Sequence, residues 1–226
     1  MNLRTRLARL ASAVADQAAR DPAFPAEIVL ILSSDPLAEG LARAAALGIP
    51  TKAIDHRAYS NRASFDATID AALREAGTEL VCLAGFMRIL TDGFVEGWAG
   101  RMINIHPSLL PLFKGTHTHA QALAAGVRLH GCTVHFVTED MDEGPIIAQA
   151  AIAIEPGDTP DRLSNRLLRA EHRLYPHALR LVLDGTVRME DGKAVFATND
   201  PIAASGSGRS GRDGPAILVS PDARDG

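Results

Sequence analysis

The chain has 226 residues, a size that favours one core-forming domain, and its 46% hydrophobic and 22% charged residues are ordinary for a globular protein. A formal net charge of −4 gives no basis for binding nucleic acid or a membrane surface, and no apolar run reaches the length of a membrane span. The two cysteines, Cys82 and Cys132, each lie in an apolar strand-like run, which indicates reduced core residues of a cytosolic protein.

Strands and helices are predicted to alternate through the first half of the chain. Residues 1–20 are rich in Ala, Leu and Arg, with leucines at helical spacing, and predict a helix. Further on, apolar runs bounded by Gly, Pro or Ser predict strands and helical segments in turn. The strands are expected at 27–32, 51–55 and 80–83, and the helical segments at 37–47, 64–76 and 92–98. This alternation favours an α/β fold with a doubly wound, mostly parallel sheet.

A short strand at 102–105 ends in a proline-bounded turn, His106-Pro107. Proline lacks an N–H and restricts the residue before it, so the strand is expected to stop there. Asn104 and His106 are two positions apart and therefore lie on one face of the extended chain. An amide donor beside a group that protonates near neutral pH suits chemistry at the end of a strand. The alternative is that both side chains only cap the strand end through hydrogen bonds.

A second stretch, residues 130–149, combines a strand, an acidic loop and another strand. Apolar and more polar residues alternate from Cys132 to Val137, as they do on a β-strand. The loop 139–145 carries several carboxylates, and 146–148 is apolar again. Neighbouring strands are expected to bring His135 and this acidic loop towards the first site.

The C-terminal part of the sequence predicts a helix, a hairpin and a tail. The helix is expected over 160–183, after a turn that caps it. Two short runs at 187–190 and 193–197 flank Asp191-Gly192, a dipeptide typical of a β-hairpin turn. Residues 199–226 are rich in Gly, Ser, Asp and Arg and predict a disordered tail. The expected organisation is therefore one domain over 1–198, followed by this tail.

Several sequence blocks between about residues 26 and 196 occur in the order and spacing of one known family. They are LAGFMRIL, INIHPSLLP, KGTHTHAQAL, HGCTVHFV, DMDEGPIIAQ and AEHRLYP. Together they closely resemble the phosphoribosylglycinamide formyltransferases, the folate-dependent transformylases of purine biosynthesis. HPSLLP alone is shared with methionyl-tRNA formyltransferases and formyltetrahydrofolate hydrolases, whereas the full set with HGCTVHFVTE indicates the glycinamide enzyme more specifically.

The resemblance implies a formyltransferase-like, Rossmann-type fold in a cytoplasmic transferase. It implies that a formyl group passes from 10-formyltetrahydrofolate, the co-substrate, to the amine of 5-phosphoribosylglycinamide (glycinamide ribonucleotide). No metal is expected, because His117 and His119 lack a third ligand at suggestive spacing. The expected partners are these small molecules, with no nucleic acid and no membrane, and the chain is expected to be a monomer or a homodimer.

The resemblance also implies roles for individual residues. Asn104 and His106 are expected to stabilise the oxyanion of the tetrahedral intermediate, and Asp142 to position His106 and shuttle protons. The expected folate-binding residues are Met87, Arg88, Ile89, Leu90, Val137, Thr138, Glu139 and Asp140. The expected substrate-binding residues are Arg62, Pro107, Ser108 and Glu171. The expected supporting residues are His117, Thr133 and His135.

Simpler interpretations stay open for several of these positions. His135 is equally consistent with a hydrogen-bonded structural histidine. Residues 87–90 are consistent with plain core packing, although Arg88 in an apolar run argues mildly against it. Arg62 is at least as consistent with a solvated surface charge.

The chain departs from the family at its start. The family opens with a strand and a glycine-containing loop at a helix N-terminus, where backbone N–H groups suit a phosphate, yet here no glycine precedes Gly40. We expect a chain truncated at its start rather than a natural loss of this loop. Two alternatives to the transferase remain: a formyltetrahydrofolate hydrolase, which passes the formyl group to water, and a non-catalytic homologue that binds folate or a partner.

Overall fold

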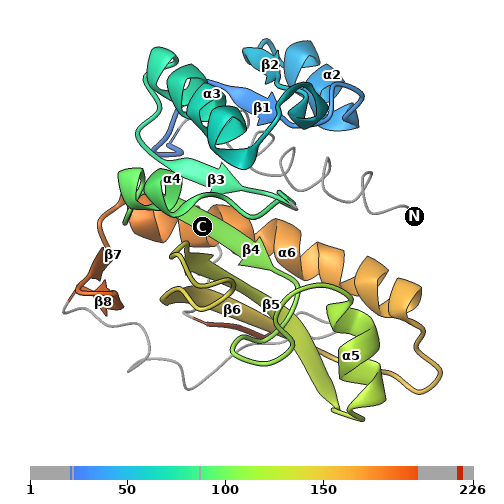
Figure 1. Cartoon of the computed structure of the whole chain (residues 1–226). Coiled ribbons are helices and arrows are strands. Elements are labelled where there is room, and N and C mark those ends of the chain that lie inside the picture. Colours follow the sequence, from blue (N-terminus) through green and yellow to red (C-terminus); the bar gives the residue numbers. More distant parts are fainter. Residues whose placement is uncertain (1–20, 22, 87, 198–217, 221–226) are drawn as a thin grey trace. The chain divides into compact units, whose positions relative to one another are not determined.

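The computed structural model describes residues 21, 23–86, 88–197 and 218–220 (Figure 1). The helix expected over 1–20 and the predicted folate ligand Met87 lie outside these described residues. The chain divides into two compact units, one up to Ile103 and one from Asn104 onward. The strand β4, Met102–His106, begins in the first unit and ends in the second.

The first unit contains a small parallel sheet and several helices. β1, Ile31–Ser33, pairs in parallel with β2, Thr51–Ala53, and α2, Glu39–Ala46, connects the two strands. β1 overlaps the expected strand at 27–32 only at residues 31 and 32, and it extends to Ser33, the last residue that pairs with β2. The later elements of this unit are η1, His56–Ala58, α3, Arg62–Glu75, β3, Val81–Leu83, and α4, Asp92–Gly97.

Local sequence signals account for the start and the end of α3. Asn61 is the N-cap residue, and its side chain accepts a hydrogen bond from the Ser64 N–H at 2.9 Å. Gly77, with φ of 70°, follows the end of the helix and adopts the left-handed conformation that glycine permits. The buried apolar side chains of α3 are Phe65, Ile69, Ala72 and Leu73. Their helical spacing gives α3 one apolar face, which packs into the core of the first unit.

The prediction that both cysteines are core residues is correct for only one of them. Cys132 in β5 is fully buried, whereas Cys82 in β3 is exposed. Successive side chains of a strand point to opposite faces, and in β3 the buried position belongs to Val81. The two cysteines form no disulfide.

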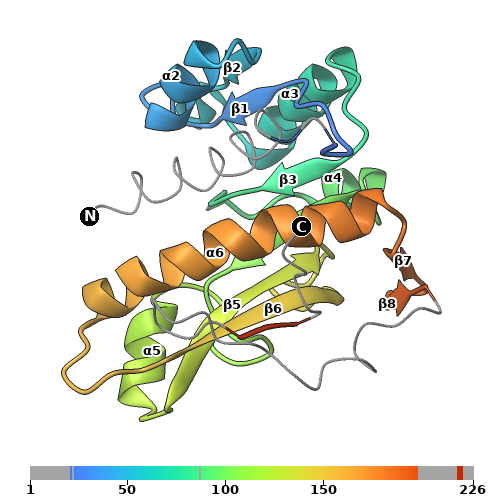
Figure 2. The ribbon, with the colours of Figure 1, turned by 180° about the vertical axis from the view of Figure 1, so that it is seen from behind.

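The second unit is built on antiparallel strands. The end of β4 lies beside β5, Leu129–Phe136, which pairs antiparallel with β6, Ile146–Ala153. β6 in turn pairs antiparallel with β9, Leu218–Ser220. The long helix α6, Pro160–Leu183, runs across one face of the β5–β6 pair (Figures 1 and 2). The remaining elements are α5, Thr118–Ala124, β7, Val187–Glu190, and β8, Lys193–Phe196.

The core of the second unit lies between α6 and this sheet. On β5 the apolar side chains of Cys132, Val134 and Phe136 alternate along the strand as the sequence predicts and are fully buried, and the polar side chains between them, Thr133 and His135, are buried as well. Fully buried side chains on α6 recur at helical spacing, at Leu163, Leu167, Leu174 and Tyr175. Full burial of one such leucine or phenylalanine side chain contributes about 2 kcal/mol to stability. This packing holds β5, the strand that carries His135, against α6.

The predicted α/β fold is confirmed, and the sheet pairings are mixed. β1 and β2 run parallel, whereas β5, β6 and β9 run antiparallel. The predicted hairpin is confirmed as well, because β7 and β8 pair around Asp191 and Gly192. Both turn residues have positive φ, as a two-residue hairpin turn favours.

One part of the predicted disordered tail is ordered. Leu218–Ser220 forms β9, in register with Gln149 to Ala151 of β6. Without this pairing, the edge of β6 would leave backbone N–H and C=O groups without partners, so even a short segment gains hydrogen bonds by adding to it. The other residues of the range 199–226 lie outside the described part of the chain.

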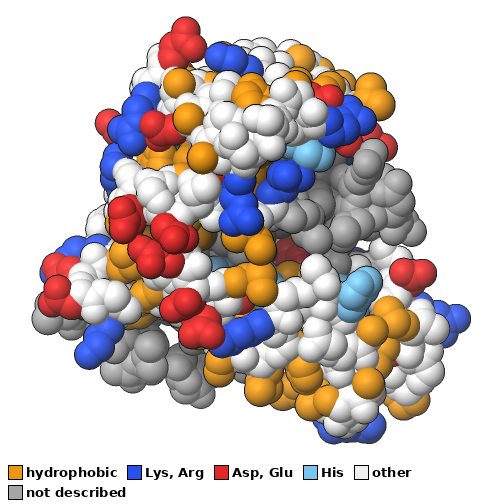
Figure 3. Space-filling view, viewed as in Figure 1, with side chains coloured by type: hydrophobic (Ala, Val, Ile, Leu, Met, Phe, Trp, Pro, Cys, Tyr) orange, Lys and Arg blue, Asp and Glu red, His pale blue; other side chains and the backbone are white. Residues whose placement is uncertain are grey.

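Acidic and basic side chains are interspersed on the face drawn in Figure 3, so neither sign of charge dominates that face. This agrees with the modest net charge of −4. Among the helices of the described residues, none is long and apolar enough to span a membrane.

Candidate active site

His106, the last residue of β4, is 5% exposed and lies between two oxygen atoms. Its ring Nδ1 is 3.4 Å from Asp142 Oδ1, and its Nε2 is 3.0 Å from the carbonyl oxygen of Phe113. A neutral imidazole carries a single N–H, so only the doubly protonated ring donates towards both oxygens. The surroundings of His106 therefore offer an oxygen to each ring nitrogen, with the carboxylate at the longer distance.

His135, on the neighbouring strand β5, has different partners. Its Nε2 lies 3.2 Å from the side-chain Nδ2 of Asn104, and its Nδ1 lies 2.8 Å from the carbonyl oxygen of Phe136. The amide nitrogen of Asn104 only donates, so the His135 Nε2 that receives this bond carries no proton. The proton of the neutral ring is then on Nδ1, where it is donated to Phe136.

The electrostatic environment of His135 favours the same neutral form. Burial lowers the pKa of His135 below its ordinary value, because the charged ring loses its hydration. The hydrogen bond to the Phe136 carbonyl and the Asp142 carboxylate act in the opposite direction, and the neighbouring His106 adds to the lowering of this pKa. The environment of His135 thus favours the neutral ring, whose Nε2 accepts from the Asn104 amide.

Asp142 connects the acidic loop to the segment that follows β4. Its Oδ1 faces the His106 ring, and its Oδ2 accepts a hydrogen bond from the Gly115 backbone N–H at 2.8 Å. The side chain is only 10% exposed. Both carboxylate oxygens are therefore engaged, which fixes the orientation of the group beside His106.

The acidic loop passes close to the end of β5, and Gly144 makes this approach possible. A Cβ atom at this position would lie 1.7 Å from the carbonyl oxygen of Phe136 and 3.2 Å from Nδ1 of His135. No side chain larger than hydrogen fits there without a shift of the backbone. Gly144 thus helps to determine where Asp142 lies.

Thr133, also on β5, holds the turn that follows His106. Its fully buried hydroxyl donates to the Ser108 carbonyl at 2.7 Å and accepts from the Leu110 N–H at 3.0 Å. Gln149 on β6 also donates to this hydroxyl, at 3.0 Å. The hydroxyl of Ser108 is itself buried and donates to the Leu112 carbonyl at 2.6 Å. The turn is therefore held in one shape by side-chain hydrogen bonds from β5 and β6.

Three residues in the loops around His106 have backbone conformations that non-glycine residues rarely adopt. Phe113, His117 and Asp142 have φ of 55°, 59° and 58°. Among the described residues, only Asp191 in the hairpin turn shares this feature without being glycine. Each such residue costs roughly 1–2 kcal/mol, so its surroundings must hold it in place.

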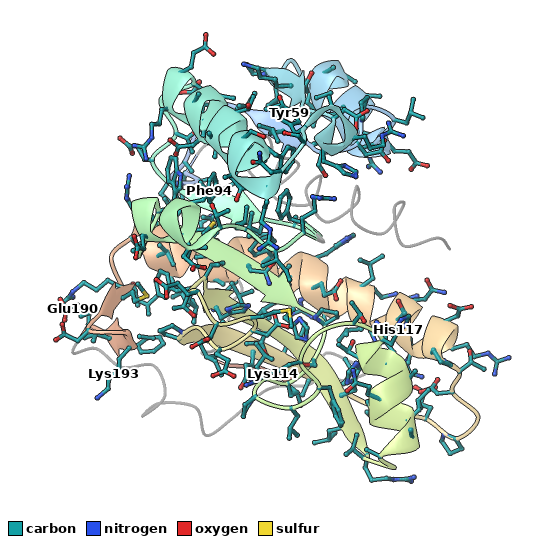
Figure 4. All side chains as sticks on the ribbon, viewed as in Figure 1. Tyr59, Phe94, Lys114, His117, Glu190 and Lys193 are labelled. Atoms are coloured by element: carbon teal, nitrogen blue, oxygen red, sulfur yellow. The ribbon has the colours of Figure 1, made fainter. Side chains whose placement is uncertain are left out.

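A cavity of about 130 Å³ lies against Asp142 within the second unit. Its lining residues are Leu110, Pro111, Lys114, Asp142, Glu143, Gly144 and Ile146. Lys114, labelled in Figure 4 on the segment between β4 and α5, forms an ion pair with Glu143 at 2.6 Å. This ion pair joins the two loops that supply Phe113 and Asp142.

The described residues contain no group of three or more His, Cys, Asp or Glu side chains that could hold a metal ion. His117 is exposed at the N-cap position of α5 (Figure 4). His119 instead faces β5, where its Nδ1 lies 3.0 Å from Nε2 of His130.

Comparison with known proteins identifies the family. The formyl transferase family matches the chain over residues 6–179. The phosphoribosylglycinamide formyltransferase of Bacillus subtilis (strain 168) is 42% identical over 160 residues, which are 71% of this chain and 82% of that protein. The chain belongs to the formyl transferase family, among the phosphoribosylglycinamide formyltransferases. The resemblance inferred from the sequence blocks is thereby confirmed.

Two further relatives of this formyl transferase extend the comparison. The trifunctional purine biosynthetic protein adenosine-3 of Bos taurus is 52% identical over 182 residues, which are 80% of this chain. The chain spans only 18% of the length of that relative. The crystal structure of glycinamide ribonucleotide transformylase 1 from Symbiobacterium toebii matches with a TM-score of 0.79 and 40% identity, over 87% of this chain and 90% of that chain.

In this formyl transferase, the second unit gathers five predicted site residues: Asn104, His106, Thr133, His135 and Asp142. Four predicted folate-binding residues lie in this unit. Val137 and Thr138 are half-buried, and Glu139 and Asp140 are exposed. Glu171 is buried on α6 at 3% exposure. Pro107 accepts a hydrogen bond at its carbonyl from the Thr118 hydroxyl at 2.7 Å.

The other predicted binding residues lie in the first unit. Arg62 is the exposed first residue of α3. The guanidinium of Arg88 lies 5.6 Å from the centre of the Phe65 ring. Ile89 is 62% exposed and Leu90 is 9% exposed. The interpretation of this segment as plain core packing therefore fits Leu90 and does not fit Ile89.

The sequence did not indicate Phe113, Gly115 or Gly144 as parts of the site. Phe113 and Gly115 contribute backbone atoms, and any residue type can supply a carbonyl or, proline excepted, an N–H. Gly144 carried a signal, since it stands directly before Pro145 at the end of the acidic loop. That signal predicts a turn at Gly144. It does not predict the close approach of Gly144 to Phe136, because this contact forms only in the folded chain.

Proposed function

We propose that this chain transfers a formyl group from 10-formyltetrahydrofolate to the amine of 5-phosphoribosylglycinamide, in purine biosynthesis. The observation that carries the proposal is the position of His106 between Asp142 and the Phe113 carbonyl, with Asn104 two residues before it on β4. The names of the relatives support it: one is a phosphoribosylglycinamide formyltransferase and another is a purine biosynthetic protein.

The reaction requires one bond to form and one to break at the formyl carbon. The amine nitrogen attacks this carbon, and the carbonyl oxygen becomes an oxyanion in the tetrahedral intermediate. The amine then loses a proton, the bond to N10 of the folate breaks, and N10 takes up a proton as it leaves. Catalysis therefore needs donors for the oxyanion and a path for the proton.

Asn104 and His106 supply donors for the oxyanion in this proposal. The side-chain amide of Asn104 has two hydrogens, and one of them is directed to His135. The second remains for the developing charge. The Nε2 proton of His106 is donated to the Phe113 carbonyl, and exchange of this partner for the formyl oxygen preserves the number of hydrogen bonds.

Asp142 is proposed to act on His106 and on the proton. Its carboxylate lies at the opposite ring nitrogen and stabilises the positive charge of an imidazolium that donates to the oxyanion. It also lies on the wall of the cavity, where water has access to it. We assign it the transfer of the amine proton through such a water molecule.

Folate binding by residues 87–90 and 137–140 and ribonucleotide binding by Arg62, Pro107, Ser108 and Glu171 belong to the same proposal. His117, Thr133 and His135 keep their predicted supporting roles in it. A cytoplasmic location is part of the proposal, supported by two cysteines that form no disulfide. The expected assembly is a monomer or a homodimer.

The test is a formyl-transfer assay with 10-formyltetrahydrofolate, with and without glycinamide ribonucleotide. Tetrahydrofolate production that depends on the ribonucleotide supports the proposal. Equal production without it supports a hydrolase, and no production by folded protein supports a non-catalytic homologue. His106→Ala is expected to lower turnover by about 100-fold or more. The control is His56→Ala, because His56 bonds the Ser34 carbonyl at 3.1 Å and packs edge-on against the Phe65 ring within the first unit.

A further inference from the structure

Asp66 on α3 is a buried carboxylate with a specific partner. It is 2% exposed, and its Oδ2 accepts a hydrogen bond of 2.7 Å from the backbone N–H of Thr91. Its Oδ1 has no hydrogen-bond partner among the described residues. A buried carboxylate with so few hydrogen bonds does not favour folding, so stability alone does not explain an aspartate here.

Thr91 is the residue at which the segment 88–90 joins α4. It is the N-cap of α4, and its side chain makes no capping hydrogen bond. Its carbonyl accepts from the N–H groups of Phe94 and Val95. The Thr91 backbone is thus held by α4 through its carbonyl and by Asp66 through its N–H.

The residue beside Asp66 holds the other end of the same segment. Phe65 is 2% exposed, and the guanidinium of Arg88 lies 5.6 Å from the centre of its ring. Tyr59, labelled in Figure 4, packs against this ring with centroids 5.5 Å apart. The ring is therefore fixed in place, and the cation–π contact restrains Arg88.

These two contacts come from consecutive residues of α3 and bracket Ile89 and Leu90. Ile89 is 62% exposed although it is a large apolar side chain. An apolar side chain that is presented to solvent between two fixed points is suited to contact a ligand. The segment is thus held in a defined shape while its apolar centre stays accessible.

We infer that Asp66 is a positioning residue for the binding of 10-formyltetrahydrofolate, and that it acts by holding the segment 88–91 through the Thr91 N–H. This inference rests on the proposed function, in which residues 87–90 bind the folate. In this inference Asp66 acts only on the segment 88–91. Its loss should therefore weaken folate binding and leave the affinity for the ribonucleotide unchanged.

The variants are Asp66→Ala, Asp66→Asn and a matched control, Asp70→Ala. Asparagine keeps an oxygen that accepts from Thr91, whereas alanine removes the acceptor. Asp70 lies one turn further along α3 and is also a hydrogen-bonded carboxylate, but its partners are Arg74 at 2.7 Å and the Trp98 indole N–H at 2.9 Å. It therefore reports on damage to α3 that does not involve the segment 88–91.

The measurements are the equilibrium Kd for 10-formyltetrahydrofolate without ribonucleotide, the KM of each substrate, and the melting temperature. Asp66→Ala is expected to raise the Kd and the KM for the folate about tenfold, as the loss of one buried hydrogen bond implies. The KM for the ribonucleotide should stay within about twofold, and Asp66→Asn should recover most of the folate affinity. Asp70→Ala should lower the melting temperature and leave both KM values unchanged.

Different results overturn different statements. Wild-type protein that binds no folate overturns the proposed function together with this inference. Wild-type protein that binds folate, with an Asp66→Ala variant that binds it equally well, overturns only the inference, as does an equal rise of both KM values. If Asp66→Ala does not fold, the test uses Asp66→Asn instead. The exchange rate of the Thr91 amide hydrogen and the folate Kd are then compared between this variant and the wild type. An exchange rate faster than that of the wild type, together with an unchanged folate Kd, overturns the positioning role.

Discussion

His106 and His135 are both buried in the second unit, yet their neighbours give them opposite hydrogen-bonding roles. His106 meets an acceptor at each ring nitrogen, at Asp142 and at the Phe113 carbonyl. His135 meets a donor at Nε2 and an acceptor at Nδ1. One ring therefore faces an oxygen at each nitrogen, whereas the other accepts at one nitrogen, donates at the other and so orients an amide.

The difference shows that burial alone does not decide what a histidine does. The exposed fractions of the two residues are 5% and 2%, so they are almost equally removed from solvent. Their roles diverge because the carboxylate lies next to His106, while the Asn104 amide lies next to His135. Substitutions that exchange or remove these partners test the comparison directly.

The largest effect is expected from Asp142→Asn, which removes the negative charge beside His106. An amide at this position no longer stabilises a positive ring, and we expect kcat to fall about 1,000-fold, within the range of general acid–base effects. The measurement is kcat at saturating concentrations of both substrates. The control is Asp184→Asn, at the exposed C-cap of α6, which should retain full activity. Turnover within a few-fold of wild type in Asp142→Asn would remove Asp142 from the mechanism.

The sequence predicted which residues lie together in this candidate site better than it predicted their contacts. Period-two alternation on β4 places Asn104 and His106 on one face, and this needs only an extended chain. The partner at His106 Nε2 depends instead on Phe113, whose φ of 55° is set by the surrounding loop. A local sequence pattern does not encode such a backbone conformation in a phenylalanine.

The same distinction applies to the fold. Hydrophobic periodicity and turn residues predicted α3, α6 and the β7–β8 hairpin because these elements depend on nearby residues. β9 was missed because Leu218–Ser220 is a strand only where the distant edge of β6 pairs with it. The burial of Asp66 is equally a tertiary property, since a carboxylate on a helix usually faces water.

The next largest effect is expected from Gly144→Ala. The added Cβ would lie 1.7 Å from the Phe136 carbonyl oxygen, so the acidic loop must move and carry Asp142 with it. A displacement of about 1 Å at a catalytic group lowers kcat by about 100-fold, and the overpacking costs roughly 1–3 kcal/mol of stability. Steady-state kinetics and urea unfolding measure the two effects.

Gly93→Ala is the matched control for this substitution. Gly93 lies in α4, and a Cβ there meets no atom within 4 Å. Alanine should therefore be neutral or stabilise the protein by about 0.5–1 kcal/mol, since glycine is unfavourable inside a helix. If Gly144→Ala changes kcat and stability no more than Gly93→Ala does, the acidic loop accommodates a methyl group beside His135.

A smaller and pH-dependent effect is expected from His135→Gln. Burial lowers the pKa of His135 in the folded protein, so the unfolded chain, with a pKa of about 6.5, binds the proton first as the pH falls. Above that pH, the titration of His135 does not change the free energy of unfolding. Below that pH, it lowers the free energy of unfolding by at most about 1.4 kcal/mol per pH unit. The variant should lose less stability than the wild type between pH 7.5 and 5.5.

The His135→Gln variant also tests whether His135 orients the Asn104 amide. Glutamine has a side-chain oxygen that can accept from Asn104, but it lacks the shape of the ring, and we expect a fall in kcat of about tenfold at pH 7.5. Thermal unfolding at a series of pH values and kinetics at the highest pH provide the two readouts. An unchanged pH dependence of the melting temperature would mean that His135 titrates alike in the folded and unfolded chains.

The smallest effect is expected at the ion pair between Lys114 and Glu143, which joins the loops of Phe113 and Asp142. The side chains are 35% and 54% exposed, so solvent and salt screen their attraction, and such pairs contribute about 0–1 kcal/mol. Lys114→Gln, Glu143→Gln and the double variant form a cycle that isolates the pair. We expect a coupling below about 1 kcal/mol that vanishes at high salt, with kcat changed less than about twofold. A large, salt-independent loss of kcat in either single variant would show instead that this surface contact, rather than the Gly115–Asp142 hydrogen bond, holds the loops around His106.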